Sequence, residues 1–248
     1  MLTSDHVADI IRAHSNSRPR NRQKALGPSS LGTPCQRRLG YQLLDVDKVN
    51  TGSDPLAAWI GTAVHAQMEQ ALADNDDWET EIGIELPGYN IIGTADAFHK
   101  PTRTVVDWKV VGETTLKRVR STGTVGEQYR TQVHLYGLGL DMAGYDVDTV
   151  AICMIPRSGR LIGMHMWQER LNHDVAETAL RRYEAIDTLT ESMGQPLLPM
   201  LATADAFCSW CPWWLPAATD ITEACPGHQD LPRPAEETTQ PNTAKETA

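Results

Sequence analysis

The sequence predicts an α/β fold in which helices flank a mixed central sheet. The chain has 248 residues, enough for one sizeable core. Its segments read as helix, three strands, helix, two strands, helix, which differs from a regular βαβ repeat. Hydrophobic residues form 41% of the chain, an ordinary share for a globular protein. We expect a single domain over residues 1–227.

The helices follow from apolar spacing. An opening helix is expected near residues 5–14, a short one within 29–44, and longer ones near 55–73, 126–143 and 174–192. In the 55–73 segment the apolar side chains recur every fourth residue and predict a buried stripe, with His65 and Glu69 stacked one turn apart beside it. The apolar positions are Ile60, Val64, Met68 and Leu72.

The strands follow from alternation and turn residues. Ile82, Ile84 and Leu86 alternate with polar residues in 79–86, and runs at 89–98 and 103–111 continue a meander. A further pair is expected at 148–156 and 160–167, joined by a turn at 157–159. After Gly227 the tail is rich in Pro, Thr and Glu and poor in large apolar residues, so residues 228–248 are expected to be disordered.

Composition excludes some classes of protein. No run approaches the ~18 apolar residues that span a membrane, and the first residues lack an apolar signal core, so we expect a chain of the reducing bacterial cytoplasm. The net charge of -10 argues against binding nucleic acid by bulk attraction. Two basic clusters, which are either local grooves or solvated faces, are Arg12, Arg18, Arg20, Arg22 and Lys24, and Lys117, Arg118 and Arg120.

The triplet Asp107-Trp108-Lys109 has the spacing of a metal-dependent hydrolytic site. Two residues apart on a strand, Asp107 and Lys109 lie on one face while Trp108 points the other way. The carboxylate can hold a divalent cation, and the ammonium can orient or deprotonate water or stabilise charge on a phosphate. The backbone carbonyl of Trp108 is a further candidate ligand.

Other polar residues extend this candidate site. Asp96 lies on the preceding strand, where its carboxylate can approach that of Asp107 across the pair and bind the same cation. His65 on the preceding helix is a candidate ligand that suits Mn²⁺ better than Mg²⁺. Gln132 and Tyr136 share a helical face and can contact phosphate or bases, although core packing is an alternative for Tyr136.

The motifs GxxxHxxxE, GTAD, DWK and QxxxY, in this order, resemble the RecB-like branch of the PD-(D/E)XK nucleases. The resemblance implies a restriction-endonuclease-like core. It implies that His65, Asp96 and Asp107 are metal ligands and Lys109 is the catalytic lysine. Gln132 and Tyr136 match the fourth motif, and Glu69 matches the flanking acid of the first.

Five cysteines in a reducing compartment favour metal ligands or core thiols over disulfides. Cys208 and Cys211 form a C-x₂-C pair, Cys225 follows, and Cys35 is the best fourth ligand. Cys153 is flanked by apolar residues in a predicted strand, which indicates a buried thiol. Trp210, Trp213 and Trp214 crowd the same region and either shield a cluster or stack on bases.

This cysteine layout is similar to that of the iron-sulfur RecB-like nucleases, which include the CRISPR-associated Cas-four exonucleases, the AddB nuclease domain and the Dna-two nuclease-helicase. The resemblance implies a [4Fe-4S] cluster on Cys35, Cys208, Cys211 and Cys225 that staples the two ends of the chain together. The interval before Cys225 is longer than in those families, so structural Zn²⁺ is the alternative.

The sequence therefore predicts a metal-dependent DNA exonuclease that uses Mg²⁺ or Mn²⁺ and acts on single-stranded DNA ends. Its setting would be DNA recombination and repair, or the processing of CRISPR spacers with adaptation proteins. The alternatives are a structure-selective endonuclease of the same fold, and a catalytically silent DNA-binding protein with a structural metal cluster.

Overall fold

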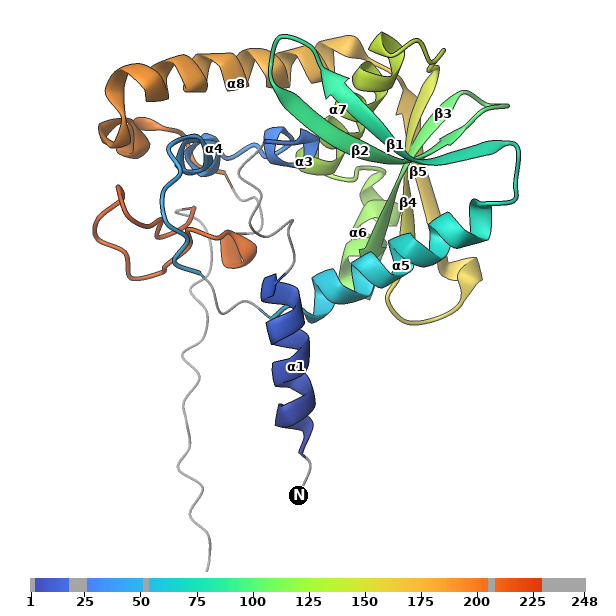
Figure 1. Ribbon diagram of the computed structural model, residues 1–248, viewed down its shortest axis with the longest axis horizontal. Helices are drawn as coiled ribbons and strands as arrows, with labels where there is room; N and C mark the ends of the chain where they lie inside the picture. Colours follow the sequence, from blue (N-terminus) through green and yellow to red (C-terminus); the bar gives the residue numbers. More distant parts are fainter. Residues whose placement is uncertain (1–2, 18–25, 51–53, 205–207, 229–248) are drawn as a thin grey trace, which may run out of the picture.

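A computed structural model describes residues 3–17, 26–50, 54–204 and 208–228. Within these residues the strands form one sheet in the order β1-β2-β3-β4-β5 (Figure 1). Strands β3 and β4 are parallel, and the other neighbours are antiparallel. The mixed sheet is thus confirmed. Its strands are β1 (Trp78–Leu86), β2 (Ile91–His99), β3 (Thr104–Val111), β4 (Thr149–Pro156) and β5 (His165–Arg170).

The expected helices are present, and two helices, α3 and α6, were not expected. The longer of them, α6, has only two buried side chains, Leu116 and Val119, too few for a clear apolar period. The α-helices are α1 (Ser4–Ser17), α3 (Pro28–Leu31), α4 (Gln36–Leu43), α5 (Leu56–Leu72), α6 (Glu113–Thr122), α7 (Glu127–Met142) and α8 (His173–Met193). Short 3-10 turns are η1 (Leu161–Gly163), η2 (Gln195–Met200) and η3 (Cys208–Trp210).

The strand predicted at 160–167 begins later than expected. Residues 161–163 form η1, and β5 starts at His165. The apolar Leu161 and Ile162 gave this segment a strand-like composition, but both side chains are exposed and so contribute nothing to the core. Composition alone cannot separate an apolar turn from a strand end.

Helices cover both faces of the sheet. On one face, the middle of α7 is buried over its whole length from 131 to 140, against Val105, Ile152 and other apolar residues of the strands. On the other face, Met68 and Leu72 of α5 pack against a small cluster around Trp108. Because β3 and β4 are parallel, the chain between them must cross over, and α6 and α7 form this crossover.

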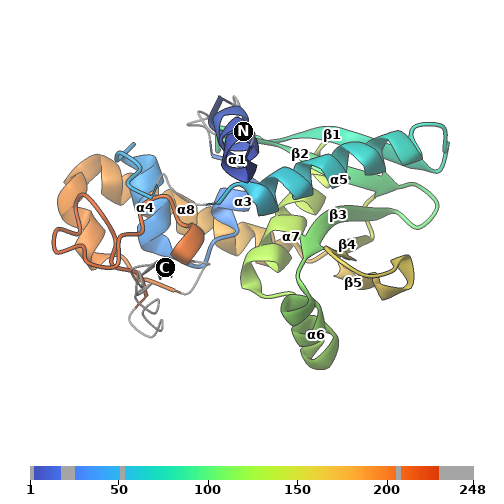
Figure 2. The ribbon, with the colours of Figure 1, turned by 90° about the horizontal axis from the view of Figure 1, so that it is seen from below.

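The buried stripe expected on α5 was wrong. No residue of α5 is buried, and its four apolar positions Ile60, Val64, Met68 and Leu72 are only partly covered. Figure 2 shows α5 lying along the outside of the sheet. Helix α5 packs against the sheet on one side only, so its apolar side chains stay partly exposed even though their spacing is that of a helix.

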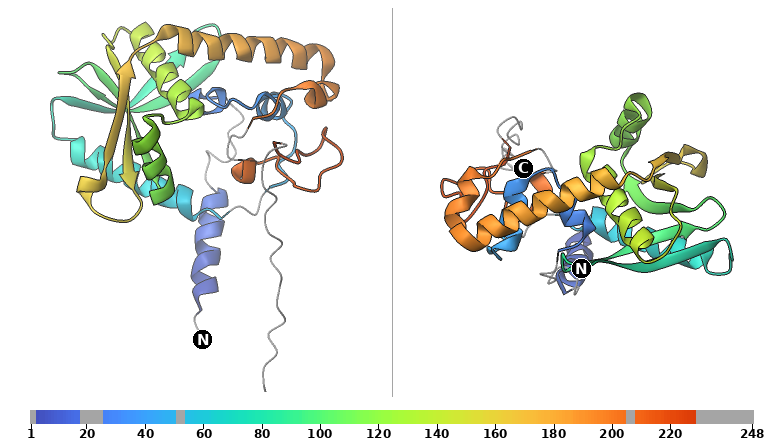
Figure 3. Two further views of the ribbon diagram at one scale, coloured as in Figure 1. Left: turned by 180° about the vertical axis from the view of Figure 1, so that it is seen from behind. Right: turned by 90° about the horizontal axis from the view of Figure 1, so that it is seen from above.

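A second apolar cluster lies beside the sheet. It includes Leu39, Tyr41, Ile186 and Trp213, and so joins α4, the end of α8 and the 208–228 segment. The long helix α8 runs from the sheet to this cluster, as Figures 1 and 3 show. Tyr183 on α8 packs against both clusters, which ties the two parts of the molecule together.

Some sequence predictions fall outside the described residues: the basic side chains Arg18, Arg20, Arg22 and Lys24, and the tail from 229 to 248. Among the helices of the described ranges, none combines the length and the apolar character that crossing a membrane requires.

Candidate functional site

The site forms where β2 and β3 separate. The two strands pair from His99 and Thr104 as far as Ala97 and Val106, and the next residues along are Asp96 and Asp107. There the strand pairing stops, and the carboxylate of Asp96 accepts a hydrogen bond from the backbone N–H of Trp108 at 2.8 Å. The split leaves room between two acidic side chains that a closed ladder would not provide.

Asp107 is held from two sides. It is 2% exposed, and its Oδ1 accepts hydrogen bonds from Lys109 Nζ at 2.9 Å and Gln132 Nε2 at 3.2 Å. Gln132 also donates to the hydroxyl of Tyr136 at 3.1 Å. Asp107 Oδ2 lies 2.7 Å from Lys109 Nζ, but the angle does not make a hydrogen bond, so this buried oxygen has no hydrogen-bond partner among the described residues.

At both Asp107 and Lys109, burial and the ion pair between the two side chains shift the pKa in opposite directions. Burial raises the pKa of Asp107 to about 6, and the nearby ammonium of Lys109 acts against that rise. Burial lowers the pKa of Lys109, but the negative charges of Asp107 and Asp96 outweigh it and leave the pKa above its usual value. The ion pair with Asp107 thus favours the ammonium form of Lys109.

Helix α5 brings His65 to the same place. His65 Nε2 lies 3.0 Å from the carbonyl oxygen of Trp108, and Nδ1 lies 3.3 Å from Asp96 Oδ1. The hydrogen bond to Asp96 raises the pKa of His65, although burial acts against this. One imidazole thus bridges a carboxylate and the backbone carbonyl that lies between Asp107 and Lys109.

Glu81 joins this group, although the sequence did not single it out. Ligand atoms of His65, Glu81 and Asp96 all lie within 4.8 Å of one another. By register Glu81 faces Asp96, and its backbone has φ of 51°, an unusual value for a non-glycine residue in a strand. In the sequence, Glu81 and Glu85 are equivalent polar positions of one alternating strand. Glu69, which the motif favoured, is exposed and lies outside this group.

Tyr129 is a second residue that the sequence did not indicate. The ammonium of Lys109 lies 5.3 Å from the centre of its ring, a cation–π distance. Tyr129 precedes Gln132 on the same helix, so a helical face that continues beyond Gln132 and Tyr136 was the available signal.

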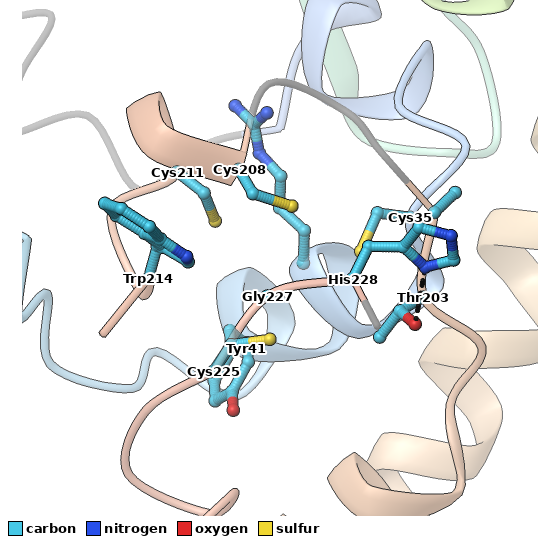
Figure 4. A pocket seen from close by; sticks show the side chains of 11 residues that line it. Cys35, Tyr41, Thr203, Cys208, Cys211, Trp214, Cys225, Gly227 and His228 are labelled. Carbon is cyan, nitrogen blue, oxygen red and sulfur yellow. Dashed lines mark hydrogen bonds between the residues drawn. The ribbon is translucent and has the colours of Figure 1, made fainter. Parts of the chain in front are cut away.

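Four cysteines that are distant in sequence line one pocket (Figure 4). Cys35 comes from the start of α4, and Cys208, Cys211 and Cys225 come from the C-terminal segment. All four are buried. Cys153 is also buried but lies on β4, and burial raises its pKa to about 11, so its prediction as a core thiol is confirmed.

An arginine lies within donor range of one of the four cysteines. Arg37 Nη1 lies 3.9 Å from Cys225 Sγ, within donor range for sulfur, while Arg37 Nε donates to the carbonyl of Leu198 at 3.0 Å. Burial raises the pKa of Cys211 to about 11, so its thiolate would need a bound cation. No three of these sulfurs in the described residues all lie within 4.8 Å of one another.

The three tryptophans have different surroundings. Trp213 is buried, stacks on Tyr41 with ring centroids 5.6 Å apart, and donates to the carbonyl of Val46 at 2.8 Å. Trp214 lines the cysteine pocket, and Trp210 is half exposed. Trp214 therefore borders the cysteine pocket, whereas Trp213 belongs to the second apolar cluster.

Comparisons with known proteins give the fold. The sequence matches no known protein family and no curated protein. The crystal structure of SSO0001 is 17% identical, covering 85% of this chain and 93% of its own, with a TM-score of 0.50. LHK-Exo, an alkaline exonuclease from Laribacter hongkongensis, is 12% identical; its complex with dAMP covers 73% of this chain and 94% of its own, with a TM-score of 0.53.

These likenesses lie well below the identity that would carry a function from one protein to another, and they describe the arrangement of the backbone. The chain therefore shares its fold with SSO0001 and with the alkaline exonuclease LHK-Exo.

Proposed function

We propose that this protein is a divalent-metal-dependent deoxyribonuclease that degrades single-stranded DNA from its ends. The observation that carries the proposal is the group of His65, Glu81 and Asp96, whose ligand atoms lie within 4.8 Å of one another, together with the adjoining ion pair of Asp107 and Lys109 where β2 and β3 separate. Bringing several charged side chains from a helix and from strands to one partly buried point costs desolvation free energy and adds no apolar packing, so such a group indicates a functional site. The fold of an alkaline exonuclease supports the same reading.

The donor set fits a hard divalent cation. His65, Asp96, Asp107 and the carbonyl of Trp108 are the proposed ligands, and Glu81 is added to them. The buried Asp107 Oδ2 makes an ion pair with Lys109 Nζ at 2.7 Å but no hydrogen bond within the described residues, so it keeps lone pairs that a cation can use. Oxygen ligands suit Mg²⁺, and the imidazole favours Mn²⁺.

Each side chain has its own task. A bound cation would activate water and neutralise charge on the phosphate. Lys109 would stabilise charge on the phosphate or orient or deprotonate the attacking water, and it also holds Asp107 in place. Gln132 fixes the carboxylate of Asp107, and the hydroxyl of the buried Tyr136, which accepts a hydrogen bond from Gln132, would contact phosphate.

The nuclease assay uses single-stranded DNA labelled at one end with Mn²⁺, comparing wild type with Asp96→Ala and Lys109→Ala. We expect both variants to lose about a hundredfold or more of the rate, because each removes a charge used in the reaction. Equal products from all three proteins would disprove the nuclease. Circular single-stranded DNA tests the mode: an exonuclease leaves circles intact, and cut circles indicate an endonuclease.

For the cysteine pocket we propose a structural [4Fe-4S] cluster held by Cys35, Cys208, Cys211 and Cys225. A single zinc ion with bonds of about 2.3 Å would bring its sulfurs to about 3.8 Å from one another. The sulfurs here are not gathered so closely. In a four-iron cluster each thiolate binds a different iron, so the ligands stand farther apart. The cluster would hold residues 1–227 as one domain in a reducing cytoplasm.

The cluster is tested by metal analysis of protein purified without oxygen. Wild type should contain about four irons per chain, and Cys211→Ser should lose most of them. Cys153→Ala is the matched control, because Cys153 is equally buried but lies outside the pocket, and it should keep its iron. Colourless wild-type protein with one zinc per chain would show that the pocket holds a structural zinc ion and not an iron-sulfur cluster.

The biological setting that fits best is DNA recombination and repair, or the processing of DNA during CRISPR spacer acquisition. Both need an enzyme that trims single strands from ends. In either setting, DNA is the partner that the proposed chemistry requires.

A further inference from the structure

Two adjacent apolar side chains stand almost fully in solvent on the turn between β4 and β5. Leu161 and Ile162 are 82% and 92% exposed, more than any other large apolar side chain of the described residues. Single exposed apolar residues are common, but a neighbouring pair at this exposure is costly in water unless it meets a partner.

The turn that carries this pair is ordered. Within η1, the N–H of Gly163 donates to Arg160 at 2.8 Å and that of Met164 to Leu161 at 2.9 Å. Arg120 on α6 anchors the turn by donating to the carbonyl of Gly163 at 2.6 Å, so α6 and the turn lie side by side (Figure 3). The apolar pair is therefore presented in a fixed position.

The turn lies at the same end of the sheet as the candidate site. Strands β3 and β4 run parallel, so the end of β4 lies beside the end of β3, where Lys109 is found. The N–H of Arg157, the first residue of the turn, donates to the carbonyl of Val111 at 2.8 Å. Lys109 is thus separated from the turn only by the last residues of β3 and the hydrogen bond from Arg157 to Val111.

The surface around the pair is basic in an acidic protein. Over residues 113–122 and 157–164 the only acid is Glu113, against five basic side chains, while the whole chain carries -10. The basic side chains are Lys117, Arg118, Arg120, Arg157 and Arg160.

We infer that α6 and the β4–β5 turn form a binding surface for single-stranded DNA, in which Leu161 and Ile162 cover the faces of unstacked bases and the basic side chains bind phosphates. In a duplex the bases cover one another, whereas a single strand offers both apolar faces and phosphates to one surface. The inference rests on the proposed nuclease, because the surface continues the path of the strand beyond the cleaved bond.

The test measures binding without cleavage. Fluorescence anisotropy of a labelled oligothymidine of about 20 nucleotides, in buffer without divalent ions, gives Kd at several salt concentrations. The first variant is Leu161→Ser with Ile162→Ser, and the second is Arg157→Gln with Arg160→Gln. The matched control is Leu189→Ser with Met200→Ser, two exposed apolar residues on α8 and η2.

The two variants should fail in different ways. Loss of the apolar pair should raise Kd about tenfold and leave the salt dependence unchanged, because base contacts release no counterions. Loss of the two arginines should reduce the slope of log Kd against log salt by about 1.4, from about 0.7 per phosphate contact on a single strand. The control should bind as wild type does, and thermal unfolding should show all three variants folded.

Wild-type affinity in the apolar variant would overturn the inference. The same holds if that variant loses sedimentation with anionic vesicles and keeps its DNA affinity, since the face would then be a membrane contact. Because no cleavage is measured, the nuclease can fail separately: no products with Mn²⁺, together with weaker binding by the apolar variant, would uphold this surface and refute the nuclease.

Discussion

The side chains of the candidate site lie around the point where β2 and β3 separate: His65, Glu81, Asp96, Asp107 and Lys109. Asp107 is held by Lys109 and Gln132, whereas Glu81 is exposed and has a left-handed backbone conformation. Strain of this kind costs on the order of 1 kcal/mol and persists where the surrounding structure enforces it. We interpret the distortion as the means by which β1 directs a carboxylate toward Asp96.

Glu81→Gln should therefore weaken Mn²⁺ binding by about tenfold, because a charged oxygen ligand is replaced by a neutral one. Isothermal titration with Mn²⁺ measures the change. Glu85→Gln is the matched control: it lies four residues along the same strand, is equally exposed, and does not belong to the ligand group in the described residues. Equal Mn²⁺ affinities of the two variants would remove Glu81 from the metal site.

His134 carries a prediction about pH. Its side chain is fully buried on α7, where it contacts Glu169 and its Nδ1 accepts from the N–H of Asn172 at 3.2 Å. Burial lowers the pKa of His134 below the ordinary histidine value of 6.5, although Glu169 acts against this. Between the lowered pKa and 6.5 the unfolded chain binds a proton that the folded chain does not.

The contribution of His134 to the free energy of unfolding is therefore complete above pH 6.5 and is lost as the pH falls from there through the folded pKa. Urea unfolding of wild type and His134→Gln across this range should show the difference between them shrinking toward low pH. A difference that grows as the pH falls would mean that the folded protein holds His134 charged beside Glu169.

At the scale of elements, a Cβ atom added at two different glycines would meet close packing at one position and open space at the other. A Cβ at Gly32 would lie 2.7 Å from the backbone oxygen of Gln128, where the end of α3 meets α7, and backbone cannot yield cheaply. A Cβ at Gly61 on α5 would meet nothing within 4 Å. The same substitution should therefore have opposite effects at the two positions.

Gly32→Ala should lower the free energy of unfolding by about 1–3 kcal/mol through overpacking, and Gly61→Ala should raise it by up to about 1 kcal/mol through helix propensity. Thermal and urea unfolding of both variants measure this. A stabilising Gly32→Ala would mean that α3 shifts easily from α7, and a destabilising Gly61→Ala would mean that α5 packs more tightly than its half-exposed residues indicate.

The sequence anticipated elements that have a strong pattern. Strand β1 alternates Ile82, Ile84 and Leu86 inward, and α7 and α8 lie where apolar spacing put them. Helix α6 was missed because Leu116 and Val119 are its only buried residues. The apolar period of α5 predicted a helix correctly, but not its burial, because burial depends on how many neighbours a face meets.

At the scale of the molecule, α8 connects the sheet to the cysteine pocket. The early segment and the C-terminal segment meet there through hydrogen bonds, as from Asn50 Nδ2 to the carbonyls of Ser209 and Cys211, both at 3.0 Å. The sheet has its own apolar cluster, so it does not depend on these contacts for its core. The two regions should therefore differ in their dependence on bound metal.

Loss of the proposed cluster should loosen one region and spare the other. In Cys211→Ser, amide hydrogen exchange should become faster in residues 35–50 and 208–228 and stay near wild type in the strands, since cluster thiolates contribute on the order of 10 kcal/mol to local folding. Cys153→Ala serves as the control. Uniformly faster exchange throughout the sheet would show that the molecule unfolds as a unit.

The sequence by itself determined the kind of element on which the candidate residues lie: Asp96, Asp107 and Lys109 in strands, His65 on a helix, and four cysteines toward the two ends of the chain. Local pattern reveals these because strand and helix periods are encoded within a few residues. Only the tertiary structure decided that Glu81, not Glu69, stands with His65, and that Cys35 reaches Cys225. Those pairings depend on where β2 and β3 separate and on how α8 spans the molecule, which no local period contains.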